Sequence, residues 1–288
     1  RVRAGVLEQT TCDVMSRLGL DARLQQEGLT HSGVNLVFNG VALHIDLSQQ
    51  GSLHGITVYG QQEVMKDLYD AAAACAMDVQ FEAADVAVHD LSTATPRVTW
   101  QVSGQSRELT CDFVVGCDGQ HGVTRQSVPA GHITTFERDY PFGWLGILAD
   151  VPPLTEELVY CRHERGFALA SMRSPTRSRY YLQVDSDDQT DDWPDERFWD
   201  ELELRLGPEH AQKLTRGPST EKSIAPLRST VSEPMRYGNL FLAGDAAHIV
   251  PPTGAKGLNL AVSDVSLLAD ALAEHYRGGG SDALNRWS

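Results

Sequence analysis

The sequence of 288 residues has no long apolar run and comparatively little positive charge. No stretch of eighteen or more apolar residues occurs, and the first residues contain neither a signal-peptide core nor a starting Met. Lysine and arginine number 24 against 39 aspartate and glutamate residues, which gives a net charge of −15. A field of that sign repels phosphate backbones. We therefore expect a cytoplasmic protein that binds neither membranes nor nucleic acids.

The cysteines are few and show no metal or disulfide pattern. There are five, Cys12, Cys75, Cys111, Cys117 and Cys161, and none forms a C-x-x-C pair or stands at a metal spacing from a histidine. An odd number without such spacing favours reduced thiols and predicts no metal site, although a thiol nucleophile stays open as an alternative. With 41% hydrophobic and 22% charged residues, the chain is expected to fold as two domains or one large composite.

Hydrophobic periodicity predicts a mixture of helices and strands. Around Asn39-Gly40, residues 34–47 alternate between apolar and polar, which predicts a β-hairpin. The region 140–184 is punctuated by Pro, Gly and Ser and is expected to form a second, sheet-based domain. The remaining patterns predict helices over 8–19, 62–76, 198–206 and 258–276, and strands over 79–88, 97–102, 113–116 and 239–244.

An acidic segment predicts a solvated surface, whereas a segment that contains Gly-Asp predicts a ligand site. Asp185 to Glu201 holds nine acidic residues but lacks the central Gly of a calcium loop, so we expect a solvated surface segment that leads into a helix. By contrast, the apolar strand that ends in Gly244-Asp245 places a carboxylate where open α/β sheets bind nucleotides. Asp245 is the candidate acceptor for a ribityl or ribose hydroxyl.

The residues after Asp245 suit the same ligand. Gly254 and Gly257 stand at the start of a predicted helix, where backbone N–H groups can face an electron-rich ligand atom with little side chain in the way. A Gly-Asp pair alone is typical of an ordinary strand exit. The whole string GDAAHIVPPTGAKGLNLA is much more specific.

This string resembles an FAD-contact motif of the class A flavoprotein monooxygenases, and VVGCDGQHGVTRQS resembles the Asp-Gly motif of that family, which serves both FAD and NAD(P)H. Further segments are similar to the branch that hydroxylates 4-hydroxybenzoate: RVRAGVLEQ, VYGQQEV, YPFGWLGILAD, RGFALASMRS, TRSRYYLQV and EKSIAPLRS. The resemblance implies an α/β (mixed α+β) fold, in which a Rossmann-like FAD-binding domain, discontinuous in sequence, carries an inserted β-sheet substrate domain.

From the resemblance we expect residues 1–131 and 225–288 to belong to the FAD-binding domain and 132–224 to form the substrate domain, with the hairpin 33–56 joining the substrate sheet. Family members begin with a G-x-G-x-x-G unit that has no counterpart before Arg1, and they continue beyond Ser288. The expectation is therefore a central piece of a longer protein.

The substrate pocket can be argued from chemistry. A ring carboxylate calls for a planar bidentate cation, and Arg173, with Ser171 two residues earlier on the same face of a strand, offers a guanidinium and a hydroxyl. A strand arginine taken alone is more often a surface residue, and it is the resemblance that gives Ser171, Arg173 and Tyr181 this role. The resemblance also adds Pro252 to the substrate-binding and catalytic residues.

Hydroxylation of the ring carbon beside the phenolic oxygen is favoured when the phenol has lost its proton. A group in the site must therefore accept that proton. The resemblance implies that Tyr160 contacts the phenolic oxygen and that His31 stands at the solvent end of a proton relay. A histidine can change charge near neutral pH, which suits that task. Taken alone, His31 would be a plain loop histidine.

The cofactor contacts come from the resemblance as well. It assigns NADPH to Arg3, His121 and Arg228, and it links Arg179 to the position of the flavin. Basic residues suit phosphates in an otherwise acidic protein. The residues implied for FAD are Arg3, Gln61, Asp118, Asp245, Leu258 and Asn259, with Arg1 near either cofactor.

The expected function is that of an FAD-dependent aromatic hydroxylase, which converts 4-hydroxybenzoate, NADPH and O2 into 3,4-dihydroxybenzoate through a flavin C4a-hydroperoxide. NADH is not excluded as the reductant, and the family implies a homodimer. Two alternatives stay open: a sister hydroxylase that acts on another phenolic acid, and an inactive truncated flavoprotein segment.

Overall fold

The computed structural model describes residues 5–38, 41–47 and 55–287 and divides the chain into two compact units. The first unit comprises residues 1–67 and 139–227, and the second comprises 68–138 and 228–288. Arg1, Arg3 and the expected hairpin turn Asn39-Gly40 lie outside the described residues. Each unit is a mixture of helices and strands, as the predicted α/β class requires.

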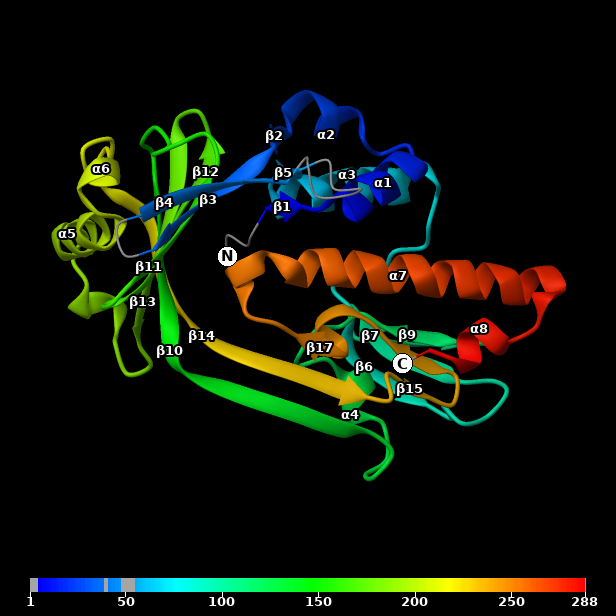
Figure 1. Cartoon of the computed structure of the whole chain (residues 1–288). Helices are drawn as coiled ribbons and strands as arrows, with labels where there is room; N and C mark the ends of the chain where they lie inside the picture. The colour runs from blue at the N-terminus through cyan, green and yellow to red at the C-terminus, as the bar shows by residue number, and fades with distance from the viewer. Residues whose placement is uncertain (1–4, 39–40, 48–54, 288) are drawn as a thin grey trace. The chain divides into compact units, whose positions relative to one another are not determined.

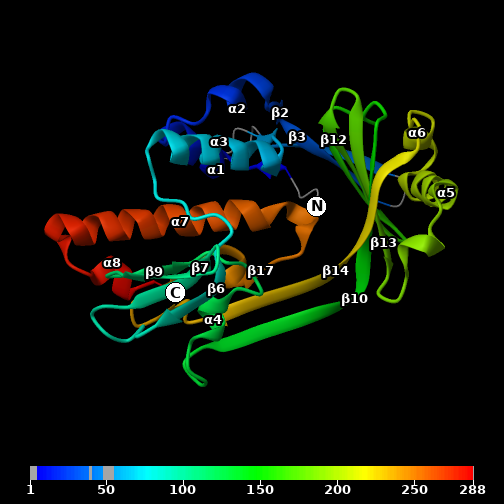
Figure 2. The same ribbon diagram turned by 180° about the vertical axis from the view of Figure 1, so that it is seen from behind.

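The largest sheet has eight strands in the order β17-β14-β10-β13-β12-β11-β3-β4, and most of it lies in the first unit (Figures 1 and 2). Its strands are β3 (Gly33–Phe38), β4 (Val41–Asp46), β10 (Thr134–Ala149), β11 (Leu158–His163), β12 (Gly166–Ser174), β13 (Arg177–Asp185), β14 (Ser219–Glu233) and β17 (His248–Ile249). Strands β10 to β13 form antiparallel pairs, whereas β3 pairs with β11 in parallel and with β4 in antiparallel fashion.

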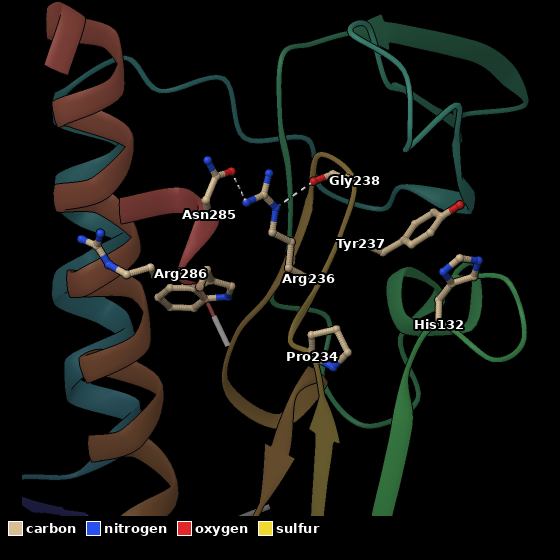
Figure 3. A pocket seen from close by; sticks show the side chains of 8 residues that line it. His132, Pro234, Arg236, Tyr237, Gly238, Asn285 and Arg286 are labelled. Atoms are coloured by element: carbon tan, nitrogen blue, oxygen red, sulfur yellow. Dashed lines mark hydrogen bonds between the residues drawn. The ribbon is translucent and has the colours of Figure 1, made fainter. Parts of the chain in front are cut away.

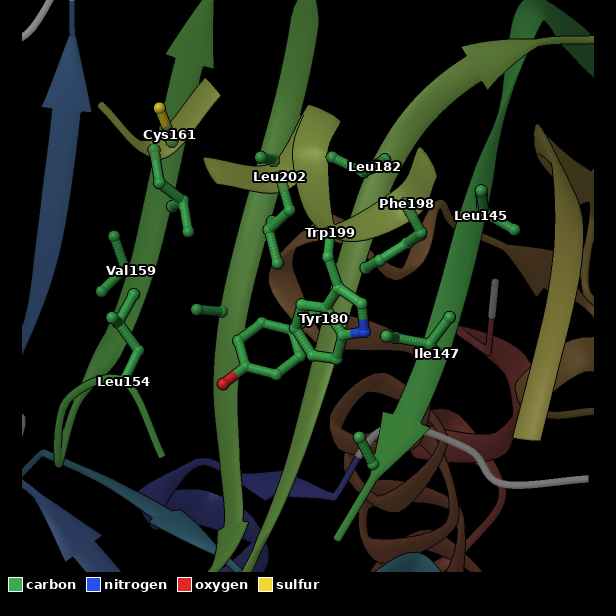
Figure 4. Close-up of a cluster of buried hydrophobic side chains, with 14 of the residues drawn as sticks. Leu145, Ile147, Leu154, Val159, Cys161, Tyr180, Leu182, Phe198, Trp199 and Leu202 are labelled. Carbon is green, nitrogen blue, oxygen red and sulfur yellow. The ribbon is translucent and has the colours of Figure 1, made fainter. Parts of the chain in front are cut away.

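Helix α5 (Asp195–Leu206) covers one face of this sheet. Its buried residues Phe198, Trp199, Leu202 and Leu206 recur at helical spacing, and Gly207 ends it with a positive φ of 79°. Figure 4 shows Tyr180 beside Trp199, with Leu202 and Phe198 of α5 over the strands. The strand residues beneath the helix alternate along the sequence: Leu145, Ile147 and Ala149 on β10, and Tyr180, Leu182 and Val184 on β13.

The first unit also holds a small sheet in the order β1-β5-β2 and three helices. A cluster around Arg23 ties two of these helices together: its guanidinium lies 2.6 Å from Asp67, contacts Glu63, and forms an i,i+4 pair with Glu27. The elements are β1 (Val6–Leu7), α1 (Gln9–Arg17), α2 (Ala22–Glu27), β2 (Leu29–His31), β5 (Ile56–Val58) and α3 (Gln61–Ala74), the last of which continues into the second unit.

The second unit contains two three-stranded sheets, β15-β16-β9 and β6-β7-β8. Strands β9 and β16 run in parallel, and the rest of both sheets is antiparallel. Their bounds are β6 (Ala84–His89), β7 (Arg97–Val102), β8 (Gln105–Thr110), β9 (Val114–Gly116), β15 (Arg236–Tyr237) and β16 (Leu240–Leu242). The helices are α4 (Val123–Gln126), α7 (Lys256–Glu274) and α8 (Asp282–Asn285).

Short helical turns complete the described chain: α6 (Pro208–Ala211), η1 (Thr190–Asp192), η2 (Gly244–Ala246), η3 (Pro252–Gly254) and η4 (His275–Gly279). The acidic run 185–201 is mostly exposed as expected, but Glu201 is only 9% exposed because two arginines pair with it. Among the described residues, none of the helices has the length and apolar character needed to cross a membrane, and no group of side chains could hold a metal ion.

Candidate active site

The face of the large sheet opposite α5 carries several of the predicted site residues. In the strand register, Tyr160 lies opposite Leu169, Leu169 opposite Tyr181, and Tyr181 opposite Gly146. Directly paired residues point to the same face of a sheet. Tyr160 and Tyr181 therefore share a face and stand two strands, or about 10 Å, apart at the backbone.

Aromatic rings line this face. Trp144 stacks on Phe167 with ring centroids 5.1 Å apart and also lies 5.1 Å from Tyr181, while Tyr160 lies 6.0 Å from Phe167. Gly146 makes room for Tyr181, because a Cβ at this position would stand 2.7 Å from the tyrosine ring. Sequence reasoning missed Trp144, Gly146 and Phe167. A glycine inside the apolar strand pattern FGWLGILAD was the available signal.

Arg173 lies at an irregularity in β12. The register with β13 shifts between Met172 and Ser174, so the strand gains one residue at Arg173. The bulge interrupts the period of two, so alternation alone does not fix the face that Arg173 takes. A hydrogen bond with Tyr181 nevertheless brings its guanidinium to the face that carries Tyr181. Ser171 itself is 5% exposed and lies opposite Arg179 in the register.

Two guanidinium groups on these strands have buried nitrogens without a partner. Within the described chain, Nε of Arg173 and both Nε and Nη1 of Arg179 have no hydrogen-bond acceptor, and neither arginine has a carboxylate partner there. Arg173 does share a hydrogen bond with Tyr181. Burial lowers the pKa of Arg173, and Tyr181 partly opposes that shift. The Arg179 guanidinium lies 5.0 Å from the centroid of the Tyr181 ring. A buried cation without a counter-ion is costly, so this face suits an anionic ligand.

His31, at the end of β2, is buried in the same unit. It is 4% exposed, and neither ring nitrogen has a partner within the described residues. Burial lowers its pKa, while the negative charges of Glu157 and Glu156 act in the opposite direction. The resemblance places such a histidine at the solvent end of a relay, whereas this one is enclosed. A neutral, enclosed imidazole can accept a proton.

Glu157 joins an exposed histidine to the segment around His31. Its carboxylate lies 2.8 Å from Nε2 of His44 and accepts a hydrogen bond of 3.2 Å from the Ser32 hydroxyl.

Burial shifts the pKa of Tyr160 in the opposite direction from that of His31, because it raises the pKa of the phenol. Tyr160 therefore stays protonated at neutral pH and can donate a hydrogen bond.

In the second unit, Asp118 is engaged within its own motif. Its carboxylate accepts hydrogen bonds from the backbone N–H of Thr124 at 2.9 Å and from the Thr124 hydroxyl at 2.6 Å. A Cβ at Gly122 would overlap the Asp118 carboxyl carbon at 1.9 Å, so this position requires a glycine. The motif thus has a local structural role at the start of α4. His121 is exposed, and Arg228 pairs with Glu137.

The second motif of this unit forms a turn followed by helix α7. Asp245 is exposed in η2, and Pro252 is exposed in η3. Ala255, with a left-handed φ of 51°, precedes α7, and its own side chain makes no capping hydrogen bond. Leu258 is half-buried, and the buried Asn259 donates to the carbonyl of Ala255 at 2.9 Å.

These features fit the electron-rich part of a flavin. The positive end of the α7 dipole attracts negative charge, and a Cβ added at Gly257 would meet no atom within 4 Å. Asp245, on the turn after β16, offers a carboxylate acceptor. Gln61 is half-buried at the start of α3 in the first unit.

A separate pocket of about 480 Å³ in the second unit contains none of the predicted site residues (Figure 3). Arg236 is its main cation, but the guanidinium is already bonded to the carbonyls of Gly238 and Leu284 and to the side chain of Asn285. The lining residues are His132, Pro234, Arg236, Tyr237, Gly238, Asn285, Arg286 and Trp287. Arg236 thus serves to hold this corner of the fold together.

Comparisons with known proteins agree with the motifs. The FAD binding domain family matches residues 1–286. The p-hydroxybenzoate hydroxylase of Acinetobacter baylyi is 54% identical over all 288 residues, which cover 71% of that protein. The kynurenine 3-monooxygenase of Salinispora tropica is 26% identical over 217 residues, which cover 65% of this chain and 44% of that enzyme.

A solved structure shows the same fold. The structure of PqsL, a probable FAD-dependent monooxygenase from Pseudomonas aeruginosa, superposes with a TM-score of 0.84 at 21% identity, covering 100% of this chain and 81% of that one. The fold class predicted from the sequence is confirmed. With its two flavin motifs, its family match and this fold, the chain belongs to the FAD binding domain family, among the class A flavoprotein monooxygenases.

Proposed function

We propose that this protein hydroxylates 4-hydroxybenzoate to 3,4-dihydroxybenzoate, with NADPH as the reductant and O2 as the oxygen source. The observation that supports this substrate is a pair of arginines, Arg173 and Arg179, whose buried guanidinium nitrogens include several without an acceptor among the described residues. Both lie beside Tyr181, on the face that also carries Tyr160. The similarity to a p-hydroxybenzoate hydroxylase supports the same choice. We also propose the division into an FAD-binding domain, residues 1–131 and 225–288, and a substrate domain, 132–224.

Arg173 binds the substrate carboxylate in this proposal. Its planar guanidinium matches a carboxylate in bidentate geometry, and a ligand carboxylate would supply the acceptor that its buried Nε lacks. The Ser171 hydroxyl and the Tyr181 phenol add donors from neighbouring positions of the same sheet. The aromatic wall of Trp144 and Phe167 keeps water away from the substrate ring.

Tyr160 and His31 handle the phenol proton. Because burial raises the pKa of Tyr160, its hydroxyl stays protonated and donates to the phenolate oxygen of the substrate. A phenolate ring is more electron-rich and reacts faster with an electrophilic oxygen. Burial favours the neutral form of His31, and its one unprotonated ring nitrogen accepts the proton that leaves the phenol. Pro252 completes the substrate-binding and catalytic residues.

The residues that the resemblance assigns to the cofactors hold them in this proposal. Asp245, Leu258, Asn259, Asp118 and Gln61 would hold FAD, with Arg1 and Arg3. Acceptance of hydride and activation of O2 are the chemistry that FAD supplies when bound. Arg3, His121 and Arg228 would contact the phosphates of NADPH. Arg179 lies close to Tyr181, where a change in its position can report an occupied substrate site to the flavin.

The test is a substrate panel on the purified full-length protein. Bound flavin is measured by absorbance, and NADPH oxidation is measured with 4-hydroxybenzoate, benzoate, 3,4-dihydroxybenzoate and 4-aminobenzoate. We expect FAD to be present and NADPH oxidation to rise strongly with 4-hydroxybenzoate only, with 3,4-dihydroxybenzoate as the product. Full activity on another phenolic acid would identify a sister hydroxylase, and absence of flavin binding would overturn the proposal.

A further inference from the structure

The turn that carries Asp245 is held against helix α7. After β16, Gly244 adopts a φ of +59°, and a Cβ added there would stand 3.1 Å from Cβ of Ala261 on α7. The backbone N–H of Ala247 donates to the carbonyl of Gly244 at 2.8 Å and closes the turn. Asp245 lies at the exposed middle of this short, tightly packed segment.

A single carboxylate oxygen on α7 bonds both ends of the turn. Oδ2 of Asp264 accepts the backbone N–H of Gly244 at 2.8 Å and lies 2.7 Å from Nε2 of His248. The side chains of Asp264 and His248 are 15% and 14% exposed, so water competes weakly for this pair. The two contacts flank Asp245 on either side in the sequence. None of the motifs recognised in the sequence included Asp264.

The charges around His248 reinforce this arrangement. The hydrogen bond to Asp264 raises the pKa of His248, and the negative charge of Asp245 raises it further. The neighbouring α4 contributes Arg125, whose guanidinium lies 3.4 Å from the carbonyl of Ala246. The raised pKa favours the protonated form of His248, which has carboxylates on its own turn and on α7.

We propose that Asp264 and His248 are positioning residues that fix the direction of Asp245 toward FAD. This inference rests on the FAD site proposed above and adds two residues to it. Neither residue needs to touch the cofactor. Their effect is to keep the turn in one conformation before FAD arrives, so that less conformational freedom is lost on binding.

The first experiment measures the dissociation constant of FAD for full-length apoprotein by quenching of flavin fluorescence. Asp264→Ala removes both contacts, and we expect FAD affinity to fall about tenfold or more. His248→Gln keeps a neutral donor and should have a smaller effect, of about threefold. Asp270→Asn changes the charge of an exposed residue on the same helix and serves as the control, with unchanged affinity.

A double-mutant cycle separates positioning from general stability. In an Asp245→Ala background, Asp264→Ala should weaken FAD binding by less than about twofold further, because the carboxylate through which Asp264 acts is gone. Full additivity of the two changes would overturn the positioning role. If Asp264→Ala does not fold, as judged by its melting curve, the cycle is run with His248→Gln and the same two outcomes decide.

The cycle also distinguishes this inference from the proposed FAD site. An Asp245→Ala variant with normal FAD affinity would remove Asp245 from the proposed site, which is a failure of the proposed function. An Asp245→Ala variant with weakened affinity and an additive effect of Asp264→Ala leaves the FAD site in place and removes only the positioning role.

Discussion

The two faces of the large sheet treat buried arginines in opposite ways. On the side covered by α5, Arg205 is 5% exposed and donates to Glu201 at 2.8 Å and to the carbonyls of Phe167 and Gln183 at 3.0 and 2.8 Å. On the other side, Arg173 and Arg179 have buried nitrogens that no acceptor in the described chain satisfies. Buried charges are normally paired. The first arginine therefore serves the fold, and the other two are available for a ligand.

The largest effect is expected where the paired arginine loses its partner. Glu201→Ala leaves Arg205 buried without a counter-ion, which should cost about 3–5 kcal/mol of unfolding free energy. The measurement is urea denaturation of the full-length protein. Glu203→Ala on the same helix removes a more exposed pair with Arg216 and should cost under about 1 kcal/mol. Equal losses in the two variants would contradict the comparison.

On the face of the sheet opposite α5, the loss of an arginine should weaken ligand binding and leave the stability of the protein unchanged. Arg173→Met removes the anchor for the substrate carboxylate and should weaken 4-hydroxybenzoate binding by about 2–5 kcal/mol, well over tenfold, with no loss of apoprotein stability. Binding is followed through the flavin absorbance change on titration. Arg162→Met, an exposed arginine of β11 that lies over Phe38, is the matched control. An unchanged substrate affinity in Arg173→Met would exclude this arginine from the pocket.

Acid should destabilise the protein by weakening the ion pairs on the face of the sheet that α5 covers. The arginines beside Glu201 lower its pKa from 4.5 to about 2. Because the folded-state pKa is depressed, the unfolded chain takes up the proton first, so this stabilisation is complete above pH 4.5 and disappears as the pH falls toward 2. Urea midpoints should decline over that window, and Glu201→Gln should show a flatter profile. Identical profiles would show that other carboxylates dominate the acid response.

The smallest effects come from two tyrosines on opposite faces. Tyr160→Phe should leave stability almost unchanged and lower the 3,4-dihydroxybenzoate formed per NADPH oxidised several-fold, because the hydroxyl that supports the phenolate is lost. Tyr180→Phe, beneath α5, should keep that ratio and change stability by less than about 1 kcal/mol. Both are measured with product analysis beside peroxide release. A fully coupled Tyr160→Phe enzyme would make Tyr160 a packing residue.

Much of the fold could be predicted because the patterns are local. The helices expected over 62–76 and 258–276 are confirmed as α3 (Gln61–Ala74) and α7 (Lys256–Glu274), and both have clear helical periodicity. By contrast, β8 is exposed along its whole length and β14 contains Pro226, so neither displays a regular apolar alternation. Their pairing partners, which lie elsewhere in the chain, decide that they are strands.

For the candidate site, the sequence offers motifs but not the three-dimensional contacts of their residues. The Gly-Asp turn and the strand arginine have recognisable surroundings in the sequence. The bulge at Arg173, the enclosure of His31 and the contact of Asp264 with Gly244 each depend on segments that are distant in the sequence. The pairing of Glu201 also depends on a distant segment, because Arg165 lies 36 residues away from it, in the turn between β11 and β12.

The bulge in β12 also has an evolutionary consequence. In a regular strand, shifting the chain by one residue moves every side chain to the opposite face of the sheet. The extra residue between Met172 and Ser174 interrupts the regular pairing, so the positions on its two sides no longer shift together. The buried positions Ala168 and Ala170 keep their place in the core whatever side chain stands at 173. Selection can therefore change the charge or length of the side chain at position 173 without first rebuilding the interior beneath α5.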